Sequence, residues 1–227
     1  MKAISRRLPP IVALAALLML AGTPATASEQ QTLVDKARLA VEEIKADSNF
    51  SNFPGLLARA KGVIVVPELV KAGFFLGGEG GRGVLLARGP ETEAWGYPAF
   101  YTLGSGSIGL QFGAQMSQVM FLVVTDGGLE KLISGSVTLG GDANVAVGPV
   151  GSGIEAGTTL NVDVDFYAFA RTKGAFFGVS LEGAALVPND EWNTAYYGAA
   201  VTPADIVVER KVTNPGADTL RGALGGQ

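Results

Sequence analysis

The chain has 227 residues, of which 32 are glycine and none is cysteine or histidine, and its formal net charge is −4. Without thiol or imidazole groups it lacks the usual nucleophiles and bases of enzymes and the usual zinc ligands. We therefore expect a non-enzymatic protein without a metal or cofactor. A nucleic-acid-binding protein would carry a basic excess, so the acidic balance argues against nucleic acid as a partner.

Residues 1–27 have the pattern of a secretory signal peptide. The segment begins with three cations, continues with an apolar run at 11–21 and ends with the cleavage motif Ala25-Thr26-Ala27. The run is too short for a membrane-spanning helix, which needs about 20 apolar residues. We predict an exported protein, periplasmic or extracellular, that is soluble or peripherally membrane-associated. The Arg6-Arg7 pair leaves the general secretory and the twin-arginine route open. Three of the 17 basic residues lie in this segment, so residues 28–227 carry 14 basic and 21 acidic side chains and a net charge of −7.

An amphipathic helix is predicted over residues 29–46. Leu33, Ala37, Val41 and Ile44 recur at steps of three and four residues, with charged side chains between them. The polar face mixes both signs, whereas helices that lie on membranes are usually rich in Lys and Arg there. We therefore favour packing on the domain over packing on a membrane, and both interpretations stay open. A second, short helix is predicted at 53–60, with Pro54 in its first turn.

After residue 61 the pattern changes to short β-rich runs broken by glycine. Strands are predicted at 62–66, 73–76, 84–87, 99–103, 107–114, 119–125, 136–147, 158–170 and 175–186. A short helix at 129–134 interrupts them, Thr202-Pro203 begins another helix, and the small, polar tail from residue 214 is predicted to end loosely. The sequence predicts one α+β domain at 28–227. It would hold a mostly antiparallel, strongly curved or barrel-like glycine-rich sheet with helices at both ends.

Residues 78–83 spell G-x-G-x-x-G, the pattern of a dinucleotide-binding turn. That turn must be followed by a helix, because the helix N-terminus supplies the N–H groups that hold the phosphates. Here Val84-Leu85-Leu86 predict a strand, and the same pattern recurs before strand-like residues at 104–109. We interpret these glycines as hairpin turns and sheet corners.

Two acidic pairs could supply oxygen ligands for a metal ion. Asp163 and Asp165 lie on one face of a predicted strand, and Asp142 and Asn144 follow two glycines. Neither pair matches the spacing of a calcium-binding loop. We interpret all four as solvated polar side chains.

A basic–aromatic block at 171–177 is the most specific candidate site. Arg171 and Lys173 lie two residues apart and so point the same way from an extended chain, and Phe176 and Phe177 follow. Cationic heads beside aromatic rings suit a phosphate group attached to an apolar tail. The alternative is a hairpin turn with exposed cations before a buried strand, and composition alone favours that alternative.

Taken together, these segments resemble the SYLF domain over about residues 30–200. The matching blocks are 61–63 with Pro67, 71–74 with 77–81 and 83–85, Trp95 with 98–100, 106–113, Gly140 with Asp142, 148–151, 171–183 and 197–198. Where the family usually reads S-R-S-K-G-L-F, this chain has A-R-T-K-G-A-F at 170–176. Both cations and the glycine are kept, one hydroxyl and a leucine are lost, and the lipid preference stays open.

The resemblance implies a lipid-binding domain. It implies that Arg171 and Lys173 contact the head group, with Lys61 and Lys71 as helpers, and that Phe176 and Phe177 lie near the acyl region. Eukaryotic members are associated with phosphoinositides and actin, which an exported protein would not meet, so we do not expect actin as a partner. We expect anionic phospholipid or a related envelope amphiphile as the ligand. The alternative is a structural or protein-interaction module of the cell envelope.

Overall fold

The computed structural model describes residues 28–73, 76–89, 93–108, 113–147, 164–172, 181 and 183–225. The helices are α1 (Glu29–Ala46), α2 (Phe53–Arg59), α3 (Asp126–Ser134), α4 (Asp190–Tyr197), α5 (Pro203–Val207) and α6 (Asp218–Leu224), with 3-10 turns η1 (Ser48–Phe50) and η2 (Pro215–Ala217). The strands are β1 (Gly62–Gly73), β2 (Leu76–Ala87), β3 (Ala99–Ile108), β4 (Gly113–Val123), β5 (Val137–Thr138), β6 (Val145–Val147), β7 (Phe166–Thr172) and β8 (Ala185–Pro188).

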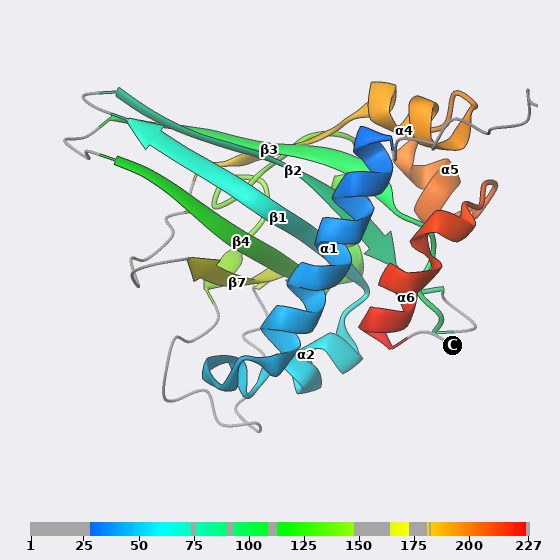
Figure 1. The fold of residues 1–227 in the computed structure, drawn as a ribbon, viewed down its shortest axis with the longest axis horizontal. Coiled ribbons are helices and arrows are strands. Elements are labelled where there is room, and N and C mark those ends of the chain that lie inside the picture. Colours follow the sequence, from blue (N-terminus) through cyan, green and yellow to red (C-terminus); the bar gives the residue numbers. More distant parts are fainter. Residues whose placement is uncertain are drawn as a thin grey trace, which may run out of the picture.

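The eight strands within the described residues belong to a single sheet, in the order β5-β8-β3-β2-β1-β4-β7-β6. Every neighbouring pair is antiparallel except β6 and β7. The four long strands β1–β4 are strongly curled, and α1 lies across one face of them with α2 and α6 beside it (Figure 1). The predicted α+β fold with a mostly antiparallel, strongly curved sheet is confirmed. Among the helices that the structure describes, none has the length and apolar character needed to cross a membrane.

One half of the long strands is buried on both faces. Val63 and Val65 of β1 pack in the core under α1, α2 and α6, while Ile64 and Val66 pack in a second core with residues of α3 and α5. A strand covered on both faces reads as a continuous apolar run rather than as an alternating one. This explains the runs at 62–66, 84–87 and 119–123.

In the other half of β2 and β3, glycine and small side chains replace most of the apolar run. On the left of Figure 1 these strand halves extend beyond the helices. Gly80 of β2 pairs with Gly104 of β3, and Gly78 pairs with Gly106. The glycines at 77–83 therefore lie inside β2 and those at 104–106 inside β3, so their interpretation as turns and corners is wrong. No nucleotide turn forms at 78–83 either, since β2 continues through Gly83 to Ala87.

Two glycines of β2 are needed where β1 carries a bulge. The register of β1 shifts between Val65 and Glu68, around Pro67. A Cβ on Gly81 would lie 2.6 Å from the carbonyl oxygen of Glu68, and one on Gly83 would lie 2.7 Å from that of Val65. Such distances leave no room for a side chain, so the two glycines let β2 stay paired with the bulged strand.

The C-terminal tail differs from the sequence prediction of a loose end. Residues 218–224 form α6, whose Leu220 and Leu224 are buried in the core beneath α1. Apolar side chains four residues apart lie on one helix face, which gives this short helix a surface to bury. Lys45 of α1 also donates a hydrogen bond to the carbonyl of Ala223 at 2.8 Å. The tail is thus part of the packed domain up to Gly225.

Candidate functional site

Arg171 lies near the end of β7, on the face of the sheet that α1 covers. Its guanidinium forms ion pairs with Glu43, at the C-terminal part of α1, and with Asp47, the residue that ends the helix, the latter at 3.5 Å. It also donates a hydrogen bond to Gln118, its cross-strand neighbour on β4, at 3.5 Å. The Arg171 side chain is 39% exposed. The pair with Glu43 is exposed on both sides and is therefore weak, whereas Asp47 is only 18% exposed.

Three members of the predicted site, Lys173, Phe176 and Phe177, lie outside the described residues. Lys61 precedes β1 and forms an ion pair with Asp126 of α3 at 3.2 Å. Lys71 lies near the other end of β1, between Glu79 of β2 and Gln115 of β4. Ten strand residues span about 33 Å, so the structure does not bring Lys61 and Lys71 together.

Lys71 and Arg171 also lie on opposite faces of the sheet. Val70 lines a hollow beside α1, whereas its neighbour Leu69 is buried in the core on the other face. Because side chains alternate along a strand, Lys71 points to the same side as Leu69. The structure therefore does not place Lys71 beside Arg171 on the face that α1 covers.

Two hollows lie along α1 on this face of the sheet. The larger has a volume of about 630 Å³ and reaches from the first turn of α1 to Trp192 of α4. The smaller, of about 150 Å³, lies between α1 and β4. Lys36 and Glu68 line both hollows, and their ion pair of 2.7 Å stands between them. We call the two hollows and this ion pair the α1 groove.

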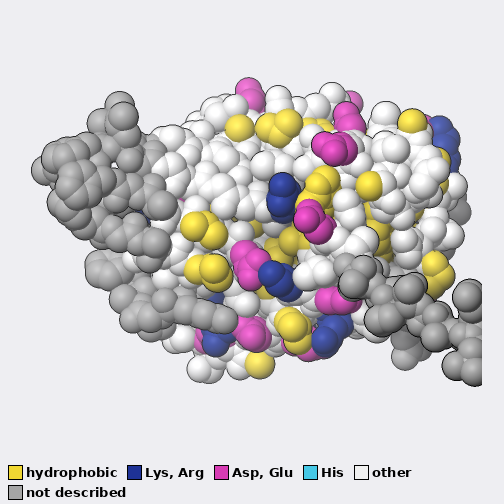
Figure 2. All heavy atoms as spheres, turned by 45° about the horizontal axis from the view of Figure 1, so that its top comes forward, with side chains coloured by type: hydrophobic (Ala, Val, Ile, Leu, Met, Phe, Trp, Pro, Cys, Tyr) yellow, Lys and Arg dark blue, Asp and Glu magenta, His cyan; other side chains and the backbone are white. Residues whose placement is uncertain are grey.

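Exposed apolar side chains gather along the α1 groove. Val70 and Leu39 are 43% and 46% exposed, and Met116, the cross-strand partner of Val70, is 45% exposed. These are three of the six large apolar side chains that are exposed among the described residues, and all three line the groove. Figure 2 shows apolar side chains near the middle of this side of the molecule, with single basic and acidic side chains between them.

The larger hollow ends at a cation and an aromatic ring. The guanidinium carbon of Arg82 lies 4.4 Å from the ring centre of Trp192. Asn189, the N-cap of α4, donates a hydrogen bond to Thr102 there at 3.3 Å. This arrangement was not predicted from the sequence, because Arg82 was interpreted as part of a glycine turn and no helix was predicted at 190–197. Asn189 and the two acidic residues after it are the start signal that would have indicated α4.

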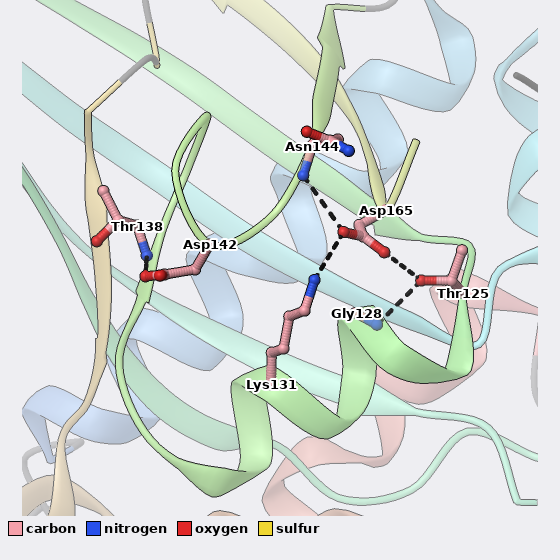
Figure 3. Close-up of polar contacts among 7 residues, drawn as sticks. All are labelled: Thr125, Gly128, Lys131, Thr138, Asp142, Asn144 and Asp165. Atoms are coloured by element: carbon pink, nitrogen blue, oxygen red, sulfur yellow. Dashed lines mark hydrogen bonds and ion pairs between the residues drawn. The ribbon is translucent and has the colours of Figure 1, made fainter. Parts of the chain in front are cut away.

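The acidic residues considered as metal ligands have structural partners where the structure describes them (Figure 3). Asp165 accepts hydrogen bonds from Thr125 at 2.6 Å, from Lys131 at 3.1 Å and from the backbone of Asn144 at 3.3 Å. Burial raises the pKa of this carboxyl, but these hydrogen bonds outweigh burial and hold the pKa below its usual value.

Asp142 closes a tight turn by accepting a hydrogen bond from the backbone of Thr138 at 2.9 Å, which lowers the pKa of its carboxyl. Within the described part of the chain, no three acidic side chains converge as a metal site would require. Asp163 lies outside the described residues. Asp165 and Asp142 therefore fix the turns that follow β4 and β5.

Comparison with known proteins gives a consistent family match. Residues 104–227 match the family described as Las17-binding protein actin regulator, Ysc84. The SH3 domain-containing YSC84-like protein 1 of Rattus norvegicus is 32% identical over 153 residues, which are 67% of this chain and 44% of that protein. LAS seventeen-binding protein 3 of Saccharomyces cerevisiae is 31% identical over 170 residues, 74% of this chain and 37% of that protein. The chain thus matches less than half the length of these curated relatives.

Proposed function

We propose that this chain, which belongs to the Ysc84 family of Las17-binding protein actin regulators, is a non-enzymatic binding module. Its resemblance to the SYLF domain predicted this family. Its ligand in this proposal is anionic phospholipid or a related envelope amphiphile. The relatives carry further segments beyond the matched part, so we do not assign the binding activities in their names to this chain as a whole. In particular, actin is not proposed as a partner of an exported protein.

The observation that carries the lipid proposal is the position of Arg171. The chain enters the basic–aromatic block from the end of β7, where the guanidinium pairs with the exposed Glu43 and with Asp47, whose side chain is 18% exposed. An exposed pair such as that with Glu43 contributes about 0–1 kcal/mol, so a phosphate group can replace this carboxylate at little cost. Arginine also binds phosphate through two parallel hydrogen bonds, which favours phosphate as the exchanged partner.

Co-sedimentation with vesicles tests the proposal. We expect the protein to bind vesicles containing phosphatidylglycerol but not purely zwitterionic vesicles, and to bind less as salt is added. The double variant Arg171→Ala/Lys173→Ala should lose most of this binding. Arg38→Ala/Lys211→Ala is the control, because it removes the same charge from three ion pairs elsewhere on the surface. Equal binding by the two double variants would exclude the head-group site.

The export part of the proposal has its own test. Cleavage after Ala27 would leave Ser28 as the first residue, and the Ser28 side chain accepts the hydrogen bond from Gln31 that caps α1. The predicted cut therefore leaves the N-cap of α1 intact. N-terminal sequencing of protein recovered from the periplasm or medium should begin at Ser28. Protein that stays in the cytoplasm with residues 1–27 attached would contradict export.

A protein-binding module of the envelope is the second candidate. It is favoured by the names of relatives, which describe Las17-binding proteins, and by the exposed apolar side chains of the α1 groove. The two candidates differ in their lipid dependence. If this candidate is right, the protein should show no affinity for vesicles. Cross-linking through a photoreactive residue at position 70 should then capture one envelope protein.

A further inference from the structure

We propose that the α1 groove binds a single-chain anionic amphiphile, with its head group at Arg82 and its alkyl chain along Val70 and Met116. This site shares the ligand class with the proposed function but uses none of the residues of the basic–aromatic block. It would take up a monomeric amphiphile, whereas the Arg171 block would contact a membrane surface.

Charge is the first reason to place the head group at Arg82. Of the carboxylates that line the groove, Glu68 is paired with Lys36 and Glu43 with Arg171. Arg82 is exposed and forms no ion pair with the residues that the structure describes. Its guanidinium stacks on Trp192, which fixes the plane of the group while leaving its N–H donors available for an anion. Glu29, at the first turn of α1, is the remaining acidic residue in this hollow.

The route of the alkyl chain follows from strand register. Gly80 lies two residues before Arg82 on β2 and pairs with Val70, and Val70 pairs with Met116 on β4. Residues two apart on a strand lie on one face, and neighbouring strands lie about 4.8 Å apart. The path from Arg82 over Gly80 to Val70 and Met116 therefore lies on one face. Leu39 of α1 lines its far end.

The size of the groove fits one chain. Small-molecule sites have volumes of about 300–1,000 Å³, and the larger hollow has about 630 Å³. Gly80 has no side chain, so an alkyl chain can lie directly on the backbone of β2 there. The Lys36–Glu68 ion pair crosses the groove, and both side chains are more than 40% exposed, so the pair can close over a bound chain or separate.

Calorimetric titration with inorganic phosphate, octyl phosphate and dodecyl phosphate, each below its micelle concentration, tests the proposal. Each fully buried methylene increases affinity roughly fourfold, so even a half-buried chain should make dodecyl phosphate bind at least tenfold more tightly than octyl phosphate. Inorganic phosphate should bind too weakly to measure. Equal affinities for the octyl and dodecyl compounds would overturn the proposal.

Variants at exposed positions locate the site without disturbing the core. Gly80→Leu fills the groove, and its Cβ meets only the carbonyl oxygen of Leu103, at 3.9 Å. It should weaken dodecyl phosphate binding at least tenfold, as should Val70→Glu, while Arg82→Gln should weaken binding of both alkyl phosphates. Val208→Glu is the matched control, since Val208 is 47% exposed and does not line the groove, and it should bind as the parent does. Unchanged binding by Gly80→Leu and Val70→Glu would overturn the assignment.

The same variants separate this proposal from the proposed function. Vesicle binding that requires Arg171 and Lys173 but is unaffected by Gly80→Leu, with no alkyl phosphate binding, would leave the proposed function and remove the groove site. A protein that does not bind vesicles but binds alkyl phosphates, and loses this binding in Gly80→Leu, would support the groove site alone. A photo-cross-linked protein partner at position 70, with no alkyl phosphate affinity, would show that the groove docks a protein and would overturn the proposal.

Discussion

The two halves of strands β1–β4 differ in how their side chains are packed. In one half, around Val65 and Phe121, side chains on both faces are buried beneath helices. In the other half, glycines on β2 and β3 and the exposed Val70 and Met116 form a face that helices leave partly open. The first half has the packing that stabilises the domain, whereas the second leaves the surface on which we propose that a ligand binds. Under this proposal, stability and binding depend on different parts of one sheet.

Truncating one side chain in each half of β4 should show the largest difference. Phe121→Ala removes a fully buried ring and should lower the free energy of unfolding by about 3–5 kcal/mol. Met116→Ala, five residues earlier on the same strand and 45% exposed, should cost less than about 1 kcal/mol. Urea unfolding followed by circular dichroism measures both values. Similar losses at the two positions would mean that the glycine-rich half is also part of the packed core.

The glycines of β2 allow a second test at the border between the halves. A Cβ on Gly83 would lie 2.7 Å from the carbonyl oxygen of Val65 and 2.8 Å from a methyl group of Val66. Gly83→Ala should therefore cost about 2–3 kcal/mol, because strands held at a bulge cannot move apart freely. Gly80→Ala meets its nearest atom at 3.9 Å and should change stability by no more than about 0.5 kcal/mol. If Gly80→Ala proved the more harmful change, the bulge would not be what requires glycine.

The sequence predicted the buried half better than the glycine-rich half. Helix 29–46 was predicted to its observed bounds, because its apolar spacing and its packing agree. The runs at 62–66 and 84–87 were predicted as strands, but β1 and β2 are each 12 residues long. Glycine weakens strand propensity, so Gly77–Gly83 indicated turns. Pairing with neighbouring strands on both sides stabilises that segment as a strand, and a single sequence does not show such pairing.

Of the candidate site, the sequence predicted residue types but not partners. Arg171 meets Glu43, which is 128 positions away in the sequence, and no local pattern indicates that contact. The Arg82–Trp192 pair also joins residues far apart in the sequence, and α4 itself was not predicted because weak helix formers such as Asn193 and Thr194 follow its start signal at Asn189. Tertiary packing of Tyr196, rather than propensity, accounts for that helix.

The polar network at the edge of the buried half should have a moderate, pH-dependent effect. Asp165→Asn keeps the shape of the side chain but removes the charge that Lys131 and Thr125 stabilise, so we expect a loss of about 1–2 kcal/mol at pH 7. Because the folded-state pKa of Asp165 is lowered, its contribution is complete above about pH 4 and is lost as pH falls through that lowered pKa. Unfolding curves at pH 7 and pH 3 should show the difference between parent and variant shrinking. A constant difference would mean that the carboxylate charge has no part in it.

Arg171 lies between the two halves, and its substitution should have the smallest effect on stability. Its register partner Gln118 lies beside the β1 bulge, and its ion pairs with Glu43 and Asp47 join β7 to α1. Since the Arg171 and Glu43 side chains are 39% and 43% exposed, solvent screens their attraction and Arg171→Ala should cost less than about 1 kcal/mol. Thermal unfolding at low and high salt measures this loss, which should shrink as salt is added.

The size of that loss decides how Arg171 can act. A loss near zero means that Glu43 and Asp47 hold the guanidinium only loosely, so the group can turn to a phosphate without unfolding the junction. Glu43→Gln should then increase the affinity for anionic vesicles, because it removes a competing carboxylate and leaves Arg171 in place. A loss above about 2 kcal/mol would instead identify a structural clamp between β7 and α1. In that case Arg171 would be needed by the buried half, and the lipid proposal would lose the one described cation on which it rests.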